Sequence, residues 1–178
     1  MPISEKIRKI TDEMEISIGM KGKRGIGVLC RGTDYVKNRP FQHAVQPSPE
    51  KMIQKTLELM EQYKYEYCYL ATEDEEVIRK YQEALGDRLL YSQKTYYEGT
   101  DNMYLNEANK RWNVNAFRKN EEYLVALLLL ARCKCFLTGR TSGAVLTMLY
   151  SNSIERFFAW NEGSYGVDDW ITLENCMI

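Results

Sequence analysis

The stretch "RGIGVLCRGTDYVKNRPFQHAVQPSPE", residues 24–50, decides the fold of this chain. Its apolar run over residues 25–30 is typical of a buried strand, and this run ends abruptly at Arg31. Ser48 and Pro49 then predict a helix start, because serine caps helices and proline fits the first helical position. The stretch therefore predicts a strand, a loop that carries the only histidine, His43, and a helix.

The rest of the chain repeats this alternation of strand and helix. Short apolar or aromatic runs predict strands at residues 65–71, 88–92, 134–138 and 154–160. Helices are predicted at residues 3–20, 120–132 and 144–151, and Asn120 is the expected cap of the second of these. A further helix is predicted to begin at a capping box formed by Thr72 and Glu75 and to end at Gly86. This order favours an α/β fold, Rossmann-like and doubly wound, with a mostly parallel sheet and helices on both faces.

Length and composition limit the class of protein. The 178 residues suit a single domain over 1–178, with a leading helix within 1–22 and a long polar loop at 93–116. A formal net charge of −1 does not favour nucleic acid as a partner. The five cysteines, four of them in or beside apolar runs, are interpreted as reduced thiols of a cytoplasmic protein. The apolar run over residues 123–131 is far shorter than the ~20 residues that a membrane-spanning helix needs. With one histidine, a metal site is not expected.

Polar residues follow three of the predicted strands, at residues 30–35, 71–74 and 138–143. Ligands of such sheets bind at the carboxyl ends of the strands. The third end, "TGRTSG", leads into a helix, and Thr141, Ser142 and the free N–H groups of that helix suit a phosphate. Arg31 or Arg140 could add a bidentate contact. Ordinary helix capping by Thr141 or Ser142 explains the same residues equally well.

The acidic and histidine residues near these ends have two interpretations each. Glu73 and Asp74 either stabilise the first turn of a helix or contact a ligand hydroxyl. His43 is either a general base or an ordinary surface histidine.

Three segments of the chain, taken in order, resemble a known family. They are "VLCRGTDY" (28–35), "CYLATEDEEVIRKYQEALGD" (68–87) and "YLVALLLLARCKCFLTGRTSGAVLTML" (123–149). They are similar to the nucleotide-sugar-binding half of GT-B fold fucosyltransferases, a group that includes α1,6-, nodulation and protein O-fucosyltransferases, and most of all to its bacterial branch. The resemblance implies that this chain is the C-terminal, donor-binding half of a GT-B fold. It also implies that the acceptor domain is absent from this chain, as a missing N-terminal domain.

The resemblance assigns roles residue by residue. Arg31 matches the arginine that contacts the donor pyrophosphate, and Thr33 and Asp34 match the pair that follows it. Thr141 and Ser142, with Arg140 and Gly143 beside them, match the phosphate-holding turn, and Glu73 and Asp74 match an acidic pair near the nucleotide. Leu29 and Gly32 depart from the α1,6 enzymes, which have a histidine and a second arginine there. Ala126 stands near an aspartate that reads guanine, so Glu122 is the alternative reader.

The activity that the resemblance implies is an inverting, metal-independent transfer of fucose or a related sugar. The donor would be a GDP-sugar, the acceptor a glycan hydroxyl of a surface polysaccharide, and no cofactor would be needed. The resemblance also allows peripheral association with a membrane-linked acceptor. Asp34 and His43 are the two candidates for the general base, and the choice between them stays open. The alternative is a non-catalytic nucleotide-sugar-binding module, or a truncated transferase half that acts as an interaction domain.

Overall fold

The computed structural model describes residues 3–32, 38–92 and 116–166. A five-stranded sheet forms the centre, with the strand order β3-β2-β1-β4-β5, and every neighbouring pair is parallel. The strands are β1 (Gly25–Leu29), β2 (Tyr67–Ala71), β3 (Leu89–Leu90), β4 (Cys135–Gly139) and β5 (Arg156–Trp160). The expected Rossmann-like α/β fold is confirmed, and its sheet is wholly parallel in the described residues.

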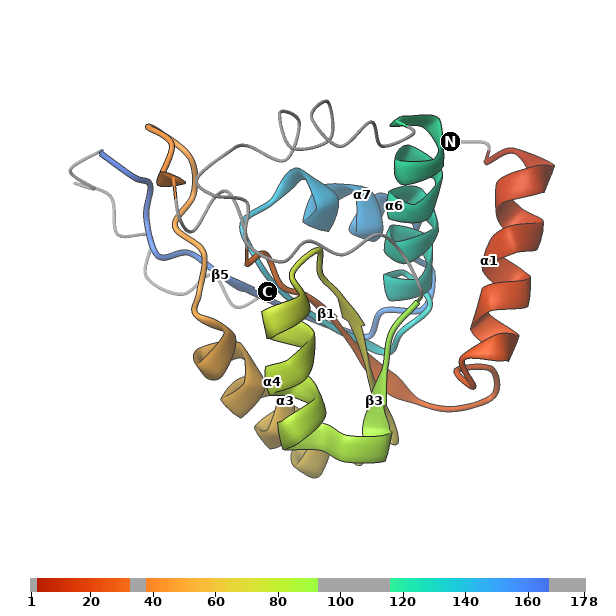
Figure 1. The fold of residues 1–178 in the computed structure, drawn as a ribbon. Helices are drawn as coiled ribbons and strands as arrows, with labels where there is room; N and C mark the ends of the chain where they lie inside the picture. The colour runs from red at the N-terminus through yellow and green to blue at the C-terminus, as the bar shows by residue number, and fades with distance from the viewer. Residues whose placement is uncertain (1–2, 33–37, 93–115, 167–178) are drawn as a thin grey trace.

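Helices cover both faces of the sheet (Figure 1). One face packs against α3 (Pro49–Tyr63) and α4 (Glu75–Leu85), which is followed by the short 3-10 turn η1 (Gly86–Arg88). The other face packs against α6 (Ala116–Leu130) and α7 (Ser142–Tyr150), and α1 (Glu5–Ser17) lies on the outside of α6. No helix in the described parts of the chain is long and apolar enough to cross a membrane.

The central strands are buried along their whole length because helices lie on both sides of them. All five residues of β1, β2 and β4 are buried, which is the pattern of strands inside a doubly covered parallel sheet. Tyr69, Phe136 and Leu70 are among the largest fully buried side chains. This core holds the carboxyl ends of the strands at one edge of the sheet, where ligands bind in folds of this class.

Several predicted helix boundaries are confirmed. The Ser48 hydroxyl accepts a hydrogen bond from the Lys51 N–H, and Pro49 is the first residue of α3. Gly86 ends α4 with φ +55°, a left-handed backbone angle that glycine adopts without strain. These boundaries were readable because capping depends on residues that are neighbours in the sequence.

Other boundaries differ from the prediction. Asp74, not Thr72, caps α4, because the Thr72 hydroxyl accepts from the Asp74 N–H and so forms a turn before the helix. Asn120 lies inside α6, which begins four residues earlier at Ala116. The strand predicted at 88–92 is reduced to Leu89–Leu90, because η1 takes up Arg88.

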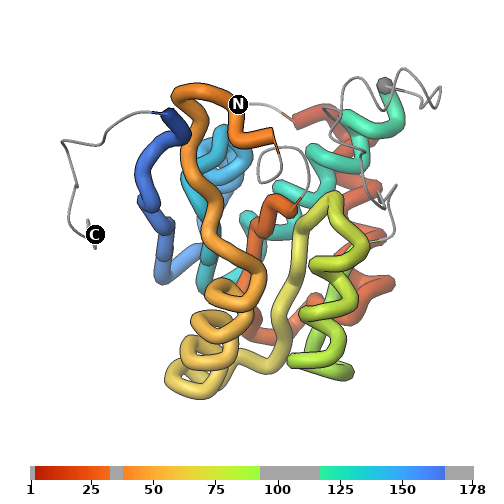
Figure 2. The backbone as a smooth tube through the Cα atoms, turned by 60° about the vertical axis from the view of Figure 1, so that its left-hand side comes forward, coloured from red at the N-terminus to blue at the C-terminus, as the bar shows by residue number. Residues whose placement is uncertain are grey.

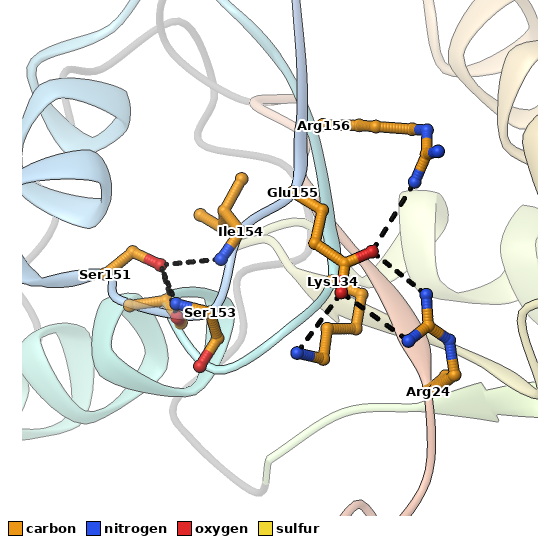
Figure 3. Close-up of polar contacts among 8 residues, drawn as sticks. Arg24, Lys134, Ser151, Ser153, Ile154, Glu155 and Arg156 are labelled. Carbon is orange, nitrogen blue, oxygen red and sulfur yellow. Dashed lines mark hydrogen bonds and ion pairs between the residues drawn. The ribbon is translucent and has the colours of Figure 1, made fainter.

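The amino ends of β1, β4 and β5 are joined by a charged cluster around Glu155 (Figure 3). Its carboxylate pairs with Arg24 at 2.9 Å, Lys134 at 3.4 Å and Arg156 at 3.5 Å. Ser151 closes the preceding turn by donating to the Ala131 carbonyl and accepting from the N–H groups of Ser153 and Ile154. The charges of this cluster pair with one another, whereas ligands of sheets of this class bind at the opposite, carboxyl edge.

Candidate functional site at the carboxyl edge of the sheet

Arg31 stands two residues beyond the end of β1, beside the end of β2. Its Nε lies 3.5 Å from Oε1 of Glu73, and the two side chains are only 22% and 18% exposed. At this distance the opposite charges of Arg31 and Glu73 attract each other in a partly buried setting. The structure therefore brings two of the predicted site residues together and fixes a guanidinium at the carboxyl edge.

Gly32 lets the chain pass closely over the first turn of α4. A Cβ at this position would lie 2.6 Å from Oδ2 of Asp74 and 2.8 Å from Cγ2 of Val77, closer than side chains tolerate. Its backbone is not left-handed, so close approach and not a tight turn requires the glycine. Gly32 therefore has a packing role at this position.

The Asp74 side chain caps the amino end of α4. Its Oδ1 accepts a hydrogen bond from the Glu76 N–H at 2.9 Å. Burial raises the pKa of the Asp74 carboxyl above its ordinary value, and the negative charges of Glu73 and Glu76 act in the same direction, against the N–H hydrogen bonds. The helix-cap interpretation of Asp74 is thus realised, and its carboxyl also lies against the chain that follows Arg31.

The end of β4 turns into α7 through the predicted "TGRTSG" segment. Thr141 is the residue that caps this helix, since its hydroxyl accepts from the Ala144 N–H at 3.1 Å. Ser142 is the first helical residue and is exposed, so its hydroxyl stands at the helix start, where N–H groups have no partner within the helix. Gly139 and Gly143 do not have left-handed backbone angles, so the backbone conformation does not require glycine at either position.

Both glycines instead allow neighbouring side chains to come close. A Cβ at Gly143 would lie 2.5 Å from the Tyr123 hydroxyl and 3.1 Å from Cδ2 of Leu29. Leu29 is the last residue of β1, so this contact places the end of β1 directly against the first turn of α7. The chain after β1, which carries Arg31, and the start of α7 therefore lie at neighbouring positions on the carboxyl edge.

His43 lies on a segment that crosses the same edge of the sheet near β4 and β5. Residues 42–45 pair with residues 163–165 after β5, through the Tyr165 N–H to the His43 carbonyl at 2.9 Å and a bridge between Ala44 and Ser164. Figure 2 shows this segment, in orange, beside the blue one that follows β5. The His43 side chain is exposed.

Gln46 fastens this crossing segment to β4. Its buried amide donates to the carbonyl oxygens of Ala44 and Arg140, both at 3.1 Å, and its Oε1 would lie 2.5 Å from a Cβ at Gly139. Arg140 is exposed and donates to Oδ1 of Asn161 at 2.7 Å. A buried glutamine therefore sets the position of the loop over the end of β4.

A wide groove of about 700 Å³ opens beside the start of α7. Phe157 and Ala159 of β5 line one side of it, and the outward side of α7 lines another. Arg140, Thr141 and Ser142 lie at one end of the groove, and most of its remaining lining is apolar. The groove therefore continues the candidate site from the strand ends along α7.

Cys30, directly before Arg31, takes no charged role. It is fully buried, and burial together with the negative charges of Glu73 and Asp74 raises the pKa of its thiol well above the ordinary value. Cys68, Cys133 and Cys135 are also buried, which agrees with the apolar runs in which they lie. The described residues hold no group of histidine, cysteine and acidic side chains arranged to bind a metal ion.

The structure describes the positions of only some residues of the sequence-predicted site. Arg31, Glu73, Asp74, Arg140, Thr141, Ser142 and Gly143 all lie at the carboxyl edge. Thr33, Asp34 and residues 93–115 of the predicted long loop lie outside the described residues. Sequence reasoning missed Gln46 and Tyr123, and no local pattern reveals them, because each acts on a residue far away in the chain.

No family model and no curated protein matches this sequence. Solved structures do match in fold. A crystal structure of POFUT1 with GDP has a TM-score of 0.57 at 12% identity, over 92% of this chain and 48% of its own. POFUT1 with GDP-fucose has a TM-score of 0.57 at 10% identity, with 92% and 47% covered. The fucosyltransferase NodZ from Bradyrhizobium has a TM-score of 0.51 at 17% identity, with 86% and 44% covered.

These similarities concern the fold, since all three identities are far below the level that would carry a function across. The chain spans slightly less than half the length of the solved proteins that it matches. The expected likeness to fucosyltransferases is thus present in three dimensions: this chain has a Rossmann-like α/β fold similar to that of fucosyltransferases solved with GDP and with GDP-fucose.

Proposed function

We propose that this chain binds the diphosphate of a nucleotide sugar between Arg31 and the start of α7. The observation that supports this proposal is the contact of Leu29 with the first turn of α7, which brings the end of β1 that precedes Arg31 against the start of this helix. A guanidinium donates several N–H groups in a plane that matches phosphate, and a helix start adds backbone N–H groups and a favourable dipole. The GDP and GDP-fucose bound to POFUT1 of similar fold support a GDP-sugar as the ligand.

The reaction proposed for this site is metal-independent, inverting transfer of fucose or a related sugar to a glycan hydroxyl. The acceptor oxygen forms a bond to the anomeric carbon while the bond from that carbon to the β-phosphate oxygen breaks. Negative charge then builds on the departing diphosphate, and Arg31 with the N–H groups around Ser142 stabilises it electrostatically. A general base takes the acceptor proton, and Asp34 and His43 are the two candidates.

The remaining site residues hold this arrangement. Glu73 orients Arg31 through the ion pair, and Asp74 keeps the chain after Arg31 against α4. Thr141 fixes the first turn of α7, so that its N–H groups point to one place. Ser142, which is exposed at that turn, would add a hydroxyl donor to a phosphate oxygen.

The second candidate function is binding of the nucleotide sugar without transfer. Such a chain would be a binding module or a transferase half that acts through a partner. The two functions differ in turnover and agree in binding.

The experiment that separates them measures GDP release from GDP-fucose, with and without a glycan acceptor. Arg31→Ala should lower the turnover about 100-fold or more, the usual effect of removing one donor to a developing charge. Arg24→Ala is the matched control, since Arg24 precedes the same strand at its opposite end and pairs with Glu155. Turnover that is measurable and equal in all three proteins would contradict the proposed role of Arg31. No turnover in the wild type, together with GDP binding measured by calorimetry, would establish the binding module.

A further inference from the structure

The groove beside α7 has an apolar part, along α7 and β5, that lies outside the proposed donor site. Val145 and Leu149 are 61% and 68% exposed on α7, and Phe157 of β5 lies across from them. Exposed large apolar side chains are ordinary when scattered, but here they line one continuous hollow. Its volume of about 700 Å³ falls within the range of roughly 300–1,000 Å³ that is usual for small-molecule sites.

The two ends of this groove differ in polarity. At the start of α7 it is lined by Arg140, Thr141 and Ser142, and along α7 it is lined by Val145, Met148 and Leu149. The Arg140 side chain is exposed and is steadied by Asn161, whose Oδ1 accepts one of its five N–H donors. A fixed cation at one end and an apolar wall along the rest complement an anionic head group with a hydrocarbon chain.

We propose that this groove binds a long-chain lipid phosphate, with the phosphate at Arg140 and the hydrocarbon chain along α7 and Phe157. This inference rests on the proposed function: the lipid phosphate is the carrier of the glycan acceptor, and its binding in the groove places that acceptor beside the donor site. The head group lies beside the start of α7, next to the place proposed for the donor diphosphate. Thr141 therefore borders both sites, and Arg140 serves the acceptor side.

The test is a calorimetric titration of the whole chain with dodecyl phosphate below its micellar concentration. Dodecyl maltoside serves as an uncharged probe with the same chain, and inorganic phosphate as the head group alone. Leu149→Gln removes apolar wall, Arg140→Gln removes the cation, and Ile16→Gln is the control, because Ile16 is 57% exposed on α1 and lies outside the groove.

We expect one dodecyl phosphate to bind per chain. Leu149→Gln should weaken both amphiphiles about tenfold, because burying a leucine side chain contributes that much affinity. Arg140→Gln should weaken dodecyl phosphate about tenfold and leave dodecyl maltoside unchanged, since only the former gives a charge-assisted hydrogen bond. Ile16→Gln should change neither, and inorganic phosphate at the same concentration should not displace dodecyl phosphate.

Three results would overturn the proposal. Dodecyl phosphate could fail to bind, it could bind equally to Leu149→Gln, or sedimentation could show that the wild type self-associates through this face and that Leu149→Gln alone dissolves the dimer. GDP titration of the same samples keeps the two proposals apart. GDP binding without dodecyl phosphate binding removes the lipid groove only, whereas the reverse result supports the groove and removes the nucleotide-sugar site.

Discussion

At the scale of single residues, Gly32 shows how packing constrains the site. It has no left-handed backbone angle, yet a Cβ there would meet Asp74 and Val77 at 2.6–2.8 Å. The position of Arg31 therefore depends on the next residue being glycine, because a Cβ there would push the chain away from α4.

Gly32→Ala should destabilise the fold by about 1–3 kcal/mol, the usual cost of forcing extra volume into a packed site. Urea denaturation measures the free energy of unfolding directly. In a Val77→Ala background the additional cost of Gly32→Ala should shrink, because one of the colliding groups is gone. An unfolding free energy that Gly32→Ala leaves unchanged would contradict the close approach described for this residue.

Asp74 makes stability depend on pH in a direction opposite to that of most carboxylates. Its folded-state pKa is raised, so the fold favours the protonated form, and its contribution is fully present below the ordinary pKa near 3.8. That contribution is lost as the pH rises through the raised value. At neutral pH the ionised carboxylate is thus less favourable in the folded chain than in the unfolded chain.

Asp74→Asn should accordingly be as stable as the wild type at pH 7, or more stable. Asparagine also caps helices well, and it removes the repulsion with Glu73 and Glu76. Urea denaturation at pH 7 and at pH 4 should show the advantage of the asparagine variant shrinking at the lower pH, where Asp74 of the wild type gains its proton. A variant that is less stable than the wild type at pH 7 would show that the charge itself strengthens the helix.

At the scale of elements, the start of α7 has two roles that one pair of variants can separate. Thr141 caps α7 and Ser48 caps α3 through the same kind of hydroxyl contact to a backbone N–H. Only α7 begins at the candidate site beside the end of β1. The two helices therefore form a matched comparison between capping and ligand binding.

Thr141→Ala and Ser48→Ala should each lower the free energy of unfolding by about 1 kcal/mol, the typical cost of losing a cap. Thr141→Ala should in addition weaken GDP binding several-fold, because its hydroxyl and the N–H groups it orients face the proposed phosphate. Urea denaturation and calorimetry on both variants measure the two effects. Equal GDP affinity in the two variants would reduce Thr141 to a structural cap.

At the scale of the whole molecule, local patterns predicted the elements, whereas contacts between distant residues were not predictable. The alternation of buried strands and amphipathic helices gave the parallel sheet, and short-range capping marked Ser48 and Gly86. The pairing of residues 42–45 with 163–165, and the anchor that Gln46 provides on β4, join segments far apart in sequence. No periodicity encodes such contacts.

The candidate site divides in the same way. Strand ends that carry Arg31, Glu73 and Thr141 were predictable, because all carboxyl ends of a parallel sheet share one edge. The need for glycine at positions 32 and 143 was not predictable, since it depends on the side chains of Tyr123, Leu29 and Asp74, which approach from other elements. The groove along α7 also escaped prediction, because an apolar helix face looks the same in sequence whether it is covered or open.

The central claim is that a nucleoside diphosphate binds between Arg31 and the start of α7, and calorimetric titration with GDP tests it most directly. The account predicts that GDP binds once per chain, that Arg24→Ala binds it as the wild type does, and that Arg31→Ala weakens it more than tenfold through loss of charge-assisted hydrogen bonds. No heat of binding with the wild type, or an affinity that Arg31→Ala leaves unchanged, would contradict the account.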